Sequence, residues 1–286
     1  MFQTKNKEQS TKNSQMPTSP HPTIGLALSG GAARGMAHVG VLRALIENKI
    51  SIDYIGGTSA GAIVGGAYAA GMQVEEIAEL GRTLRWQKVG RLTVSRLGIL
   101  SNKRLETFLR KRLPVSRFED LVIPFAAVAT DLKTGAAVVF RDEGDLPFAI
   151  RASCTIPGWY VPIADEQGRQ LVDGGLVSVI PATVTRDLGA DLVITVDVNS
   201  AGATFFGATG SVIGIVLQSL LVVQKTSSRN QIAASDLVII PQIGHIRWDQ
   251  VRRADELMDA GYAAAMEAMP NIFKLLESSS LKSAAL

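Results

Sequence analysis

Cysteine is almost absent from this chain of 286 residues: Cys154 is the only one. A single cysteine excludes an intrachain disulfide and leaves no set of thiolates for a metal site. The first 23 residues are polar and lack a continuous apolar segment, so they do not resemble a secretory signal peptide. These absences favour a reducing compartment, and we expect a cytoplasmic protein.

Charged residues are also scarce, at 19%, whereas hydrophobic residues make up 47%. This balance excludes a disordered or fibrous chain and is ample for one sizeable core. No linker interrupts the sequence between residues 24 and 276. We therefore expect a disordered polar tail over residues 1–23, a single domain over 24–276 and a C-terminal tail over 277–286.

Acidic residues are nearly missing from one segment. Residues 81–118 contain eleven Lys and Arg residues against the single acid Glu106. A solvated face would explain such a segment, and so would a surface for an anionic partner. A basic surface can also attract anionic lipid head groups, so we expect peripheral contact with an anionic membrane through residues 81–118.

A second segment, from Val198 to Gln224, contains no charged residue at all. A membrane-spanning helix needs about 20 mostly apolar residues. Polar residues and glycines interrupt this segment, and it lies between two strand-like segments. The pattern favours a buried helix, or a helix beside a substrate entrance, over a membrane span, and residues 211–223 could form one wall of an apolar groove.

Short segments rich in Val and Ile alternate with segments of helical periodicity along the chain. The strand-like segments include "TIGLALS", "SIDYIGG", "IPFAAVAT", "AAVVF", "ADLVITVDV" and "SDLVIIPQI". Alternating strands and helices predict an α/β fold with a mostly parallel sheet that is covered on both faces.

A glycine turn follows the first of these strands, in "LALSGGAARGMAHVGVL". The turn lacks the Gly-Lys-Ser/Thr ending of a phosphate-binding loop, because Met36 and Ala37 follow Gly35. It also lacks the Gly-x-Gly-x-x-Gly dinucleotide pattern, because Ala32 stands at the second glycine position. The loop nevertheless presents backbone N–H groups at a helix N-terminus, where anions are favoured.

The second strand ends in Gly57-Thr58-Ser59-Ala60-Gly61, a Gly-x-Ser-x-Gly motif between a strand and a helix. In this context the motif predicts an exposed nucleophilic serine on a sharp turn. A glycine-rich turn with a helix-capping serine would show the same letters. Two neighbouring glycine turns favour the nucleophile, because the first loop could then stabilise the oxyanion that forms when Ser59 attacks a carbonyl. The residues expected at this oxyanion hole are Gly30, Gly31, Ala32, Arg34, Gly35 and Ala60.

A serine nucleophile needs a base, and two candidates follow it in the sequence. His245 fits the Ser–acid–His order of α/β-hydrolases, but only one strand precedes the Gly-x-Ser-x-Gly strand here, which argues against that fold. The alternative is Asp173, which follows an apolar strand and precedes Gly174 and Gly175. An Asp-Gly-Gly sequence is also an ordinary turn.

Together these residues resemble the patatin-like phospholipase family. Its Gly-Gly-x-x-[Arg/Lys]-Gly pattern is matched by residues 30–35, its Gly-x-Ser-x-Gly pattern by residues 57–61 and its Asp-Gly-[Gly/Ala] pattern by residues 173–175. The segment "AIRASCTIPGWYVP" is similar to the one that such proteins carry before the aspartate. The resemblance extends over about residues 23–241, most of the chain.

The resemblance implies a three-layer α/β/α fold and a serine acyl hydrolase of the phospholipase A, lysophospholipase or carboxylesterase type. It also implies a catalytic pair, Ser59 as nucleophile and Asp173 as general base, supported by Gly57, Gly61, Gly174 and Gly175. The expected substrate is a lipid or another acyl ester; we expect no metal, no cofactor and no nucleic acid. A regulatory protein that keeps the fold and acts by binding is the alternative.

Overall fold

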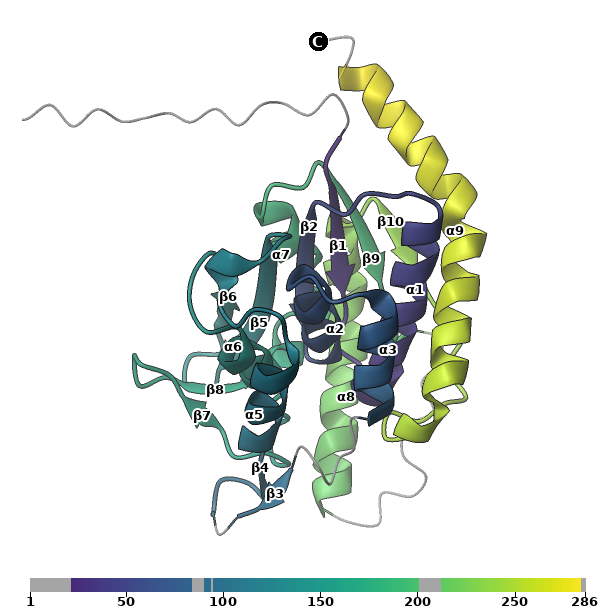
Figure 1. The fold of residues 1–286 in the computed structure, drawn as a ribbon. Coiled ribbons are helices and arrows are strands. Elements are labelled where there is room, and N and C mark those ends of the chain that lie inside the picture. Colours follow the sequence, from purple (N-terminus) through teal and green to yellow (C-terminus); the bar gives the residue numbers. More distant parts are fainter. Residues whose placement is uncertain (1–21, 84–89, 94, 201–211, 284–286) are drawn as a thin grey trace, which may run out of the picture.

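The computed structural model describes residues 22–83, 90–93, 95–200 and 212–283 (Figure 1). The tail expected over residues 1–23 therefore lies almost wholly outside the described residues. At the other end, the last helix continues to Ser283. Helical structure thus extends into the segment that the sequence set apart as a C-terminal tail.

Within the described residues, eight strands form one sheet in the order β10-β9-β1-β2-β5-β8-β7, and β6 also pairs with β5. The pairs from β10 to β5 are parallel, whereas β6, β8 and β7 add antiparallel pairs. This arrangement confirms the predicted mostly parallel sheet. The strands are β1 Ile24–Leu28, β2 Tyr54–Thr58, β5 Phe125–Asp131, β6 Ala137–Phe140, β7 Ile163–Ala164, β8 Gln170–Asp173, β9 Leu192–Val196 and β10 Leu237–Ile239.

Helices cover both faces of this sheet, as predicted (Figure 1). Helices α1, α2 and α6 pack on one face, with α9 outside α1, and α7 packs on the other face. A short antiparallel hairpin, β3 Arg91–Leu92 with β4 Leu100–Ser101, stands apart from the sheet. The helices are α1 Met36–Glu47, α2 Ala60–Ala69, α3 Val74–Thr83, α5 Lys103–Arg112, α6 Leu146–Ser153, α7 Ala182–Asp187, α8 Val212–Gln231 and α9 Ala254–Ser283.

The central strands are apolar on both sides because both of their faces are buried. In β1, Leu26 and Leu28 belong to the large core under α1, α2 and α9, whereas Ala27 packs in a smaller core with Ala182 and Val193. Successive side chains of a strand point to opposite faces, so each side of β1 serves one helical layer. This explains why β1 is a continuous apolar segment rather than an alternating one.

Helices α1 and α9 cross at two glycines. A Cβ on Gly40 would overlap the carbonyl oxygen of Met258, and a Cβ on Gly261 would overlap that of Ala37. The two backbones therefore approach more closely than any larger residue would allow. This crossing fixes α1, and with it the glycine turn that precedes the helix.

Helix α8 begins within the uncharged segment that the sequence singled out. Among the described residues, no helix combines the length and the apolarity that crossing a bilayer requires. Instead, α8 packs against the Gly174–Leu176 turn and the Ile232–Ala234 turn. The apolar segment therefore reaches the residues that follow Asp173.

Candidate active site

Two glycine turns lie side by side at one edge of the sheet. Strands β1 and β2 pair in parallel, with Leu28 opposite Gly57, so both chains leave the sheet at the same edge. The loop from residue 29 to 35 leads into α1, and Ser59 leads into α2. The two neighbouring glycine turns expected from the sequence thus lie together at the carboxyl edge of the sheet.

Ser59 occupies the sharp turn between β2 and α2. Its φ of 53° and ψ of −117° lie in a region that residues other than glycine rarely adopt. The flanking glycines make the turn possible: a Cβ on Gly61 would overlap the carbonyl oxygen of Leu28, and one on Gly57 would lie 2.7 Å from the Cα of Ala62. Local sequence thus dictates a strained turn that presents the serine hydroxyl.

Asp173 reaches Ser59 from the antiparallel part of the sheet. It ends β8, which pairs antiparallel with β5 and places Asp173 opposite Ala129. The Ser59 hydroxyl donates to Asp173 Oδ2 at 2.7 Å, and the Gly175 N–H donates to Asp173 Oδ1 at 2.8 Å. At Gly174, a Cβ would overlap the Val128 carbonyl oxygen, so the turn needs glycine there as well.

Burial sets the protonation of Asp173. The side chain is buried away from water, which raises the pKa of its carboxyl group from 3.8 to about 6. The hydrogen bonds from Ser59 and Gly175 act in the opposite direction, because they favour the charged form. The carboxylate is thus ionised at neutral pH and is a stronger base than an exposed aspartate.

Residues of α6 and the turn after it support both groups. The Ser59 N–H donates to Ser153 Oγ at 2.8 Å, and the Asp173 N–H donates to the Thr155 carbonyl at 2.8 Å. The hydroxyl of Thr130 donates to the Asp173 carbonyl at 2.9 Å. The sequence had singled out the segment from 149 to 162 without a role for Ser153, because no local pattern reveals a contact between residues so far apart.

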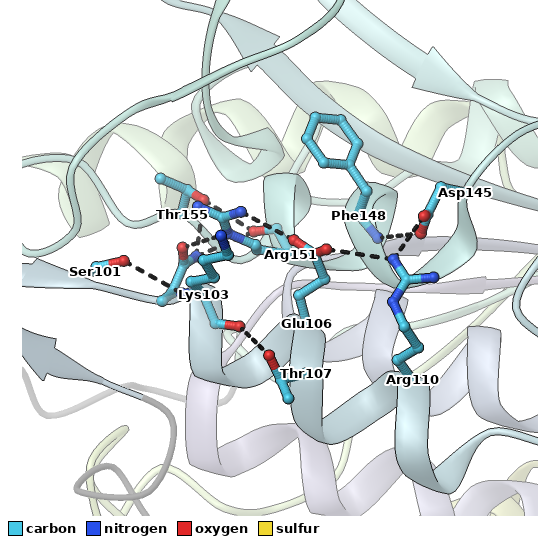
Figure 2. A network of polar contacts seen from close by, with 10 residues as sticks. Ser101, Lys103, Glu106, Thr107, Arg110, Asp145, Phe148, Arg151 and Thr155 are labelled. Atoms are coloured by element: carbon cyan, nitrogen blue, oxygen red, sulfur yellow. Dashed lines mark hydrogen bonds and ion pairs between the residues drawn. The ribbon is translucent and has the colours of Figure 1, made fainter.

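A polar network anchors this segment to α5 (Figure 2). The Arg151 guanidinium donates to Glu106 Oε2 at 2.9 Å and to Asn102 Oδ1 at 2.9 Å. The Asn102 amide donates in turn to Thr155 Oγ1 at 2.9 Å. The Arg110 guanidinium joins Glu106 to Asp145, which caps the N-terminus of α6. The network therefore connects α5 through Thr155 to the backbone of Asp173.

The first glycine loop borders the same site. The Gly30 N–H donates to the Val179 carbonyl at 2.9 Å, whereas the N–H groups of Gly31 and Ala32 have no hydrogen-bond acceptor among the described residues. Ala32 has a φ of 50°, a second strained position beside Ser59. A Cβ on Gly35 would overlap that of Ala60, so this glycine brings the loop against α2.

Arg34 is a buried residue of this loop, and its side chain anchors the loop to the turn after β10. Its Nε–H donates to the Ile246 carbonyl at 2.7 Å, and burial lowers the pKa of its guanidinium group. The sequence left open whether Arg34 supplies charge or holds the loop. The hydrogen bond to Ile246 shows that it ties the loop to the turn after β10.

Neither described histidine is hydrogen-bonded to Ser59 or Asp173. His38 is buried, with its Nε2–H donating to the Ser29 carbonyl at 2.8 Å, and burial lowers its pKa to about 4. His245 is exposed and pairs with Glu256 at 2.8 Å. His21 lies outside the described residues. Among the described residues, the titratable side chain that is hydrogen-bonded to the Ser59 hydroxyl is therefore the Asp173 carboxyl group.

Two cavities meet at Ser59. The first, which we name the α8 cavity, contains Asp173 and the glycine loop, and α8 lines it with Leu220, Leu221, Gln224 and Lys225. Of the segment 211–223 that was expected to form an apolar wall, Leu220 and Leu221 near the middle of α8 line this cavity. The second, the α3 cavity, is lined by apolar side chains of α1, α2, α3 and α5.

Cys154 lies in the wall of the α3 cavity. Burial raises the pKa of its thiol well above the ordinary value, and the negative charge of Asp173 adds to this effect. The thiol therefore stays protonated. Cys154 is thus a small buried residue of the cavity wall.

The family model of patatin-like phospholipases matches residues 26–186, more than half of the chain. The chain belongs to the patatin-like phospholipase family. This stretch runs from β1 to α7 and includes both glycine turns, Ser59 and Asp173. The resemblance inferred from three short motifs is thereby confirmed.

Relatives of this patatin-like chain include longer proteins. It is 40% identical over 188 residues to an uncharacterized NTE family protein of Mycobacterium bovis, covering 65% of this chain and 51% of the relative. It is 34% identical over 197 residues to human patatin-like phospholipase domain-containing protein 6, covering 66% of this chain and 14% of the relative. The chain thus spans about half, or much less, of the curated relatives it matches.

Solved structures share the fold at low sequence identity. VipD from Legionella pneumophila has a TM-score of 0.52 and 15% identity, covering 91% of this chain and 68% of VipD. The type III effector protein ExoU has a TM-score of 0.50 and 15% identity, covering 88% of this chain and 53% of ExoU. These likenesses support the patatin-like fold alone.

Proposed function

We propose that this patatin-like chain is a serine acyl hydrolase that cleaves fatty-acyl esters of lipids with a Ser59–Asp173 dyad. The observation that carries this proposal is the 2.7 Å hydrogen bond from the Ser59 hydroxyl to a buried carboxylate. Burial supplies the basicity that a carboxylate otherwise lacks for this task. The family membership points to lipid esters rather than to other acyl groups.

The reaction follows from this geometry in two halves. Asp173 takes the hydroxyl proton as Ser59 Oγ attacks the ester carbonyl, and the protonated Asp173 then gives that proton to the departing alcohol. An acyl-enzyme on Ser59 remains. Water, deprotonated by Asp173, attacks this ester, and the serine leaves with the proton while the fatty acid is released.

Backbone N–H groups beside Ser59 are suited to stabilise the tetrahedral oxyanion. Because the Gly30 N–H is bonded to Val179, we narrow the proposed donors to Gly31, Ala32 and Ala60. Ala60 is the first residue of α2, where N–H groups lack partners within the helix. Each such donor typically contributes about 10²–10³ in rate. Gly30, Arg34 and Gly35 would then shape the loop.

The test is ester hydrolysis by the purified chain on p-nitrophenyl esters, followed by phospholipid and lysophospholipid. Replacing Ser59 by alanine removes one hydroxyl and should abolish hydrolysis with the fold intact, as judged by circular dichroism. An organophosphonate ester should label Ser59. A folded wild-type chain that neither hydrolyses any of these esters nor reacts with the phosphonate would favour a regulatory protein that acts by binding.

We further propose peripheral attachment to an anionic membrane through the basic segment 81–118. Part of the positive charge of this segment is neutralised by ion pairs within the chain, since Arg82 pairs with Asp255, and Arg110 with Asp145. The β3–β4 hairpin instead exposes Leu92 and Leu97, at 78% and 58%, beside exposed Arg91 and Arg96. Arg85 and Lys88 lie outside the described residues. The hairpin and the start of α8 lie at the same end of the molecule (Figure 1).

Vesicle co-sedimentation tests this attachment with neutral and with anionic vesicles at low and high salt. Each cation near an anionic surface contributes about 1 kcal/mol, so the double change Arg91→Glu and Arg96→Glu should weaken binding to anionic vesicles strongly. The matched control is Lys274→Glu, an exposed cation on α9. Equal binding to both vesicles, or binding insensitive to salt, would contradict the proposal.

A further inference from the structure

The two cavities at Ser59 differ in the chemistry of their walls. The α8 cavity carries Arg34, Asp173, Asn199, Gln224 and Lys225, so it offers hydrogen bonds and two cations. The α3 cavity has no charged side chain in its wall. Cys154 and Tyr160 are part of the wall, and most of the rest is formed by aliphatic or thioether groups from four helices: Met36, Ile63, Val64, Ile77, Leu80 and Leu105.

Asp173 determines which part of an ester enters which cavity. In the proposed reaction this carboxyl must hand its proton to the departing alcohol oxygen, so the alcohol lies on the side of Asp173. Asp173 lines the α8 cavity and is not in the wall of the α3 cavity, whereas Ser59 and Ala32 border both. The carbonyl carbon is therefore placed at the junction, and the acyl chain extends away from Asp173.

We propose, on the basis of the function above, that the α3 cavity holds the acyl chain and that Met36 and Gly81 set the chain length accepted. Ile63 lies one helical turn beyond Ser59 along α2, so the cavity leads away from the nucleophile. An alkyl chain in this cavity meets apolar side chains along its length. The more polar alcohol and any phosphate head group meet Gln224 and Lys225.

Met36 and Gly81 close on each other in the wall of this cavity. A Cβ on Gly81 would overlap the sulfur and the terminal methyl of Met36, so the thioether lies directly on the glycine backbone of α3. Met36 is partly buried and unbranched, and its end can move with little strain. The side chain thus acts as an adjustable stop, and its size decides how much of the cavity is open.

The test compares kcat/KM for p-nitrophenyl butyrate, octanoate, laurate and palmitate. Met36→Ala should raise the laurate-to-butyrate ratio, because it opens the wall. Leu80→Trp should lower that ratio by about fourfold for each methylene that no longer fits. Met266→Ala, an exposed methionine on α9, and Ile46→Trp, an exposed position on α1, are the matched controls and should leave the ratio unchanged.

The variant Leu221→Trp on α8 tests the alternative that the acyl chain lies in the α8 cavity. It fills the α8 cavity and should affect all four esters to a similar degree. If Leu221→Trp lowers the laurate-to-butyrate ratio while Leu80→Trp and Met36→Ala leave it unchanged, the chain lies in the α8 cavity and the proposal is wrong.

A binding measurement separates this proposal from the catalytic one. Sodium laurate should raise the unfolding temperature of the Ser59→Ala protein, and it should raise that of the Ser59→Ala, Leu80→Trp protein much less. Equal stabilisation of the two would overturn the assignment of the cavity. Laurate binding that depends on Leu80 in a wild-type chain without esterase activity would instead refute the hydrolase and leave the cavity assignment standing.

Discussion

Replacing Asp173 by asparagine should abolish hydrolysis and also stabilise the fold at alkaline pH. Burial raises the pKa of the native carboxyl to about 6, against an ordinary value of 3.8. Well below about pH 4 the Asp173 carboxyl group is protonated in both the native and the unfolded chain, so it does not change the free energy of unfolding. Between about pH 4 and 6 the Asp173 carboxyl group loses its proton in the unfolded chain but keeps it in the native chain, so the free energy of unfolding falls as the pH rises. Above about pH 6 the carboxyl group is ionised in both states, and the full loss of unfolding free energy that its burial causes remains.

The magnitude follows from the two pKa values. A difference of about two pH units corresponds to about 3 kcal/mol of unfolding free energy. Asparagine cannot ionise, so this cost disappears in the variant. Because the unfolded chain is already partly ionised at about pH 4, the gain of Asp173→Asn over wild type should be about 2.5 kcal/mol larger at about pH 8 than at about pH 4.

Urea unfolding at the two pH values measures this double difference. Comparing pH values within each protein cancels any effect of the amide on packing or hydrogen bonding. Ser59→Ala is an informative second variant: the Ser59 hydroxyl lowers the pKa of Asp173, so its loss should raise that pKa and enlarge the pH dependence. A stability difference between Asp173→Asn and wild type that does not change with pH would refute the reasoning. In wild type, kcat/KM should fall as the pH decreases below about 6.

Three further predictions concern the surroundings of the site. Gly61→Ala forces a Cβ against the Leu28 carbonyl, so it should cost about 1–3 kcal/mol of stability and most of the esterase activity, as urea unfolding and a soluble-ester assay would show. Arg151→Met should lower stability by about 1–3 kcal/mol because it removes two hydrogen bonds and leaves Glu106 half-buried with Arg110 alone; an unchanged urea midpoint would contradict the role of the network. His245→Ala should retain most of the activity; a loss as large as that of Asp173→Asn would restore a Ser–His mechanism.

The sequence was sufficient for features that depend on neighbouring residues. The apolar segments and their spacing predicted β1, β2, α1 and α2, because strand and helix periodicity is local. The Gly-x-Ser-x-Gly letters predicted the turn at Ser59, because the close approach to Leu28 excludes any side chain at Gly61. Amphipathic α3, short α6 and the β3–β4 hairpin were not predicted.

The tertiary structure alone decided which partners these elements meet. Ser59 and Asp173 are 114 positions apart, and their contact exists because β8 pairs antiparallel with β5 beside β2. The same holds for Ser153 beneath the Ser59 N–H and for Val179 on the Gly30 N–H. The division of the site into a cavity with charged side chains in its wall and a cavity without them likewise depends on α8 and α3 lining different cavities beside Ser59. Local sequence patterns do not predict such contacts, because burial and hydrogen bonding between distant segments arise only when the helical layers pack on the sheet.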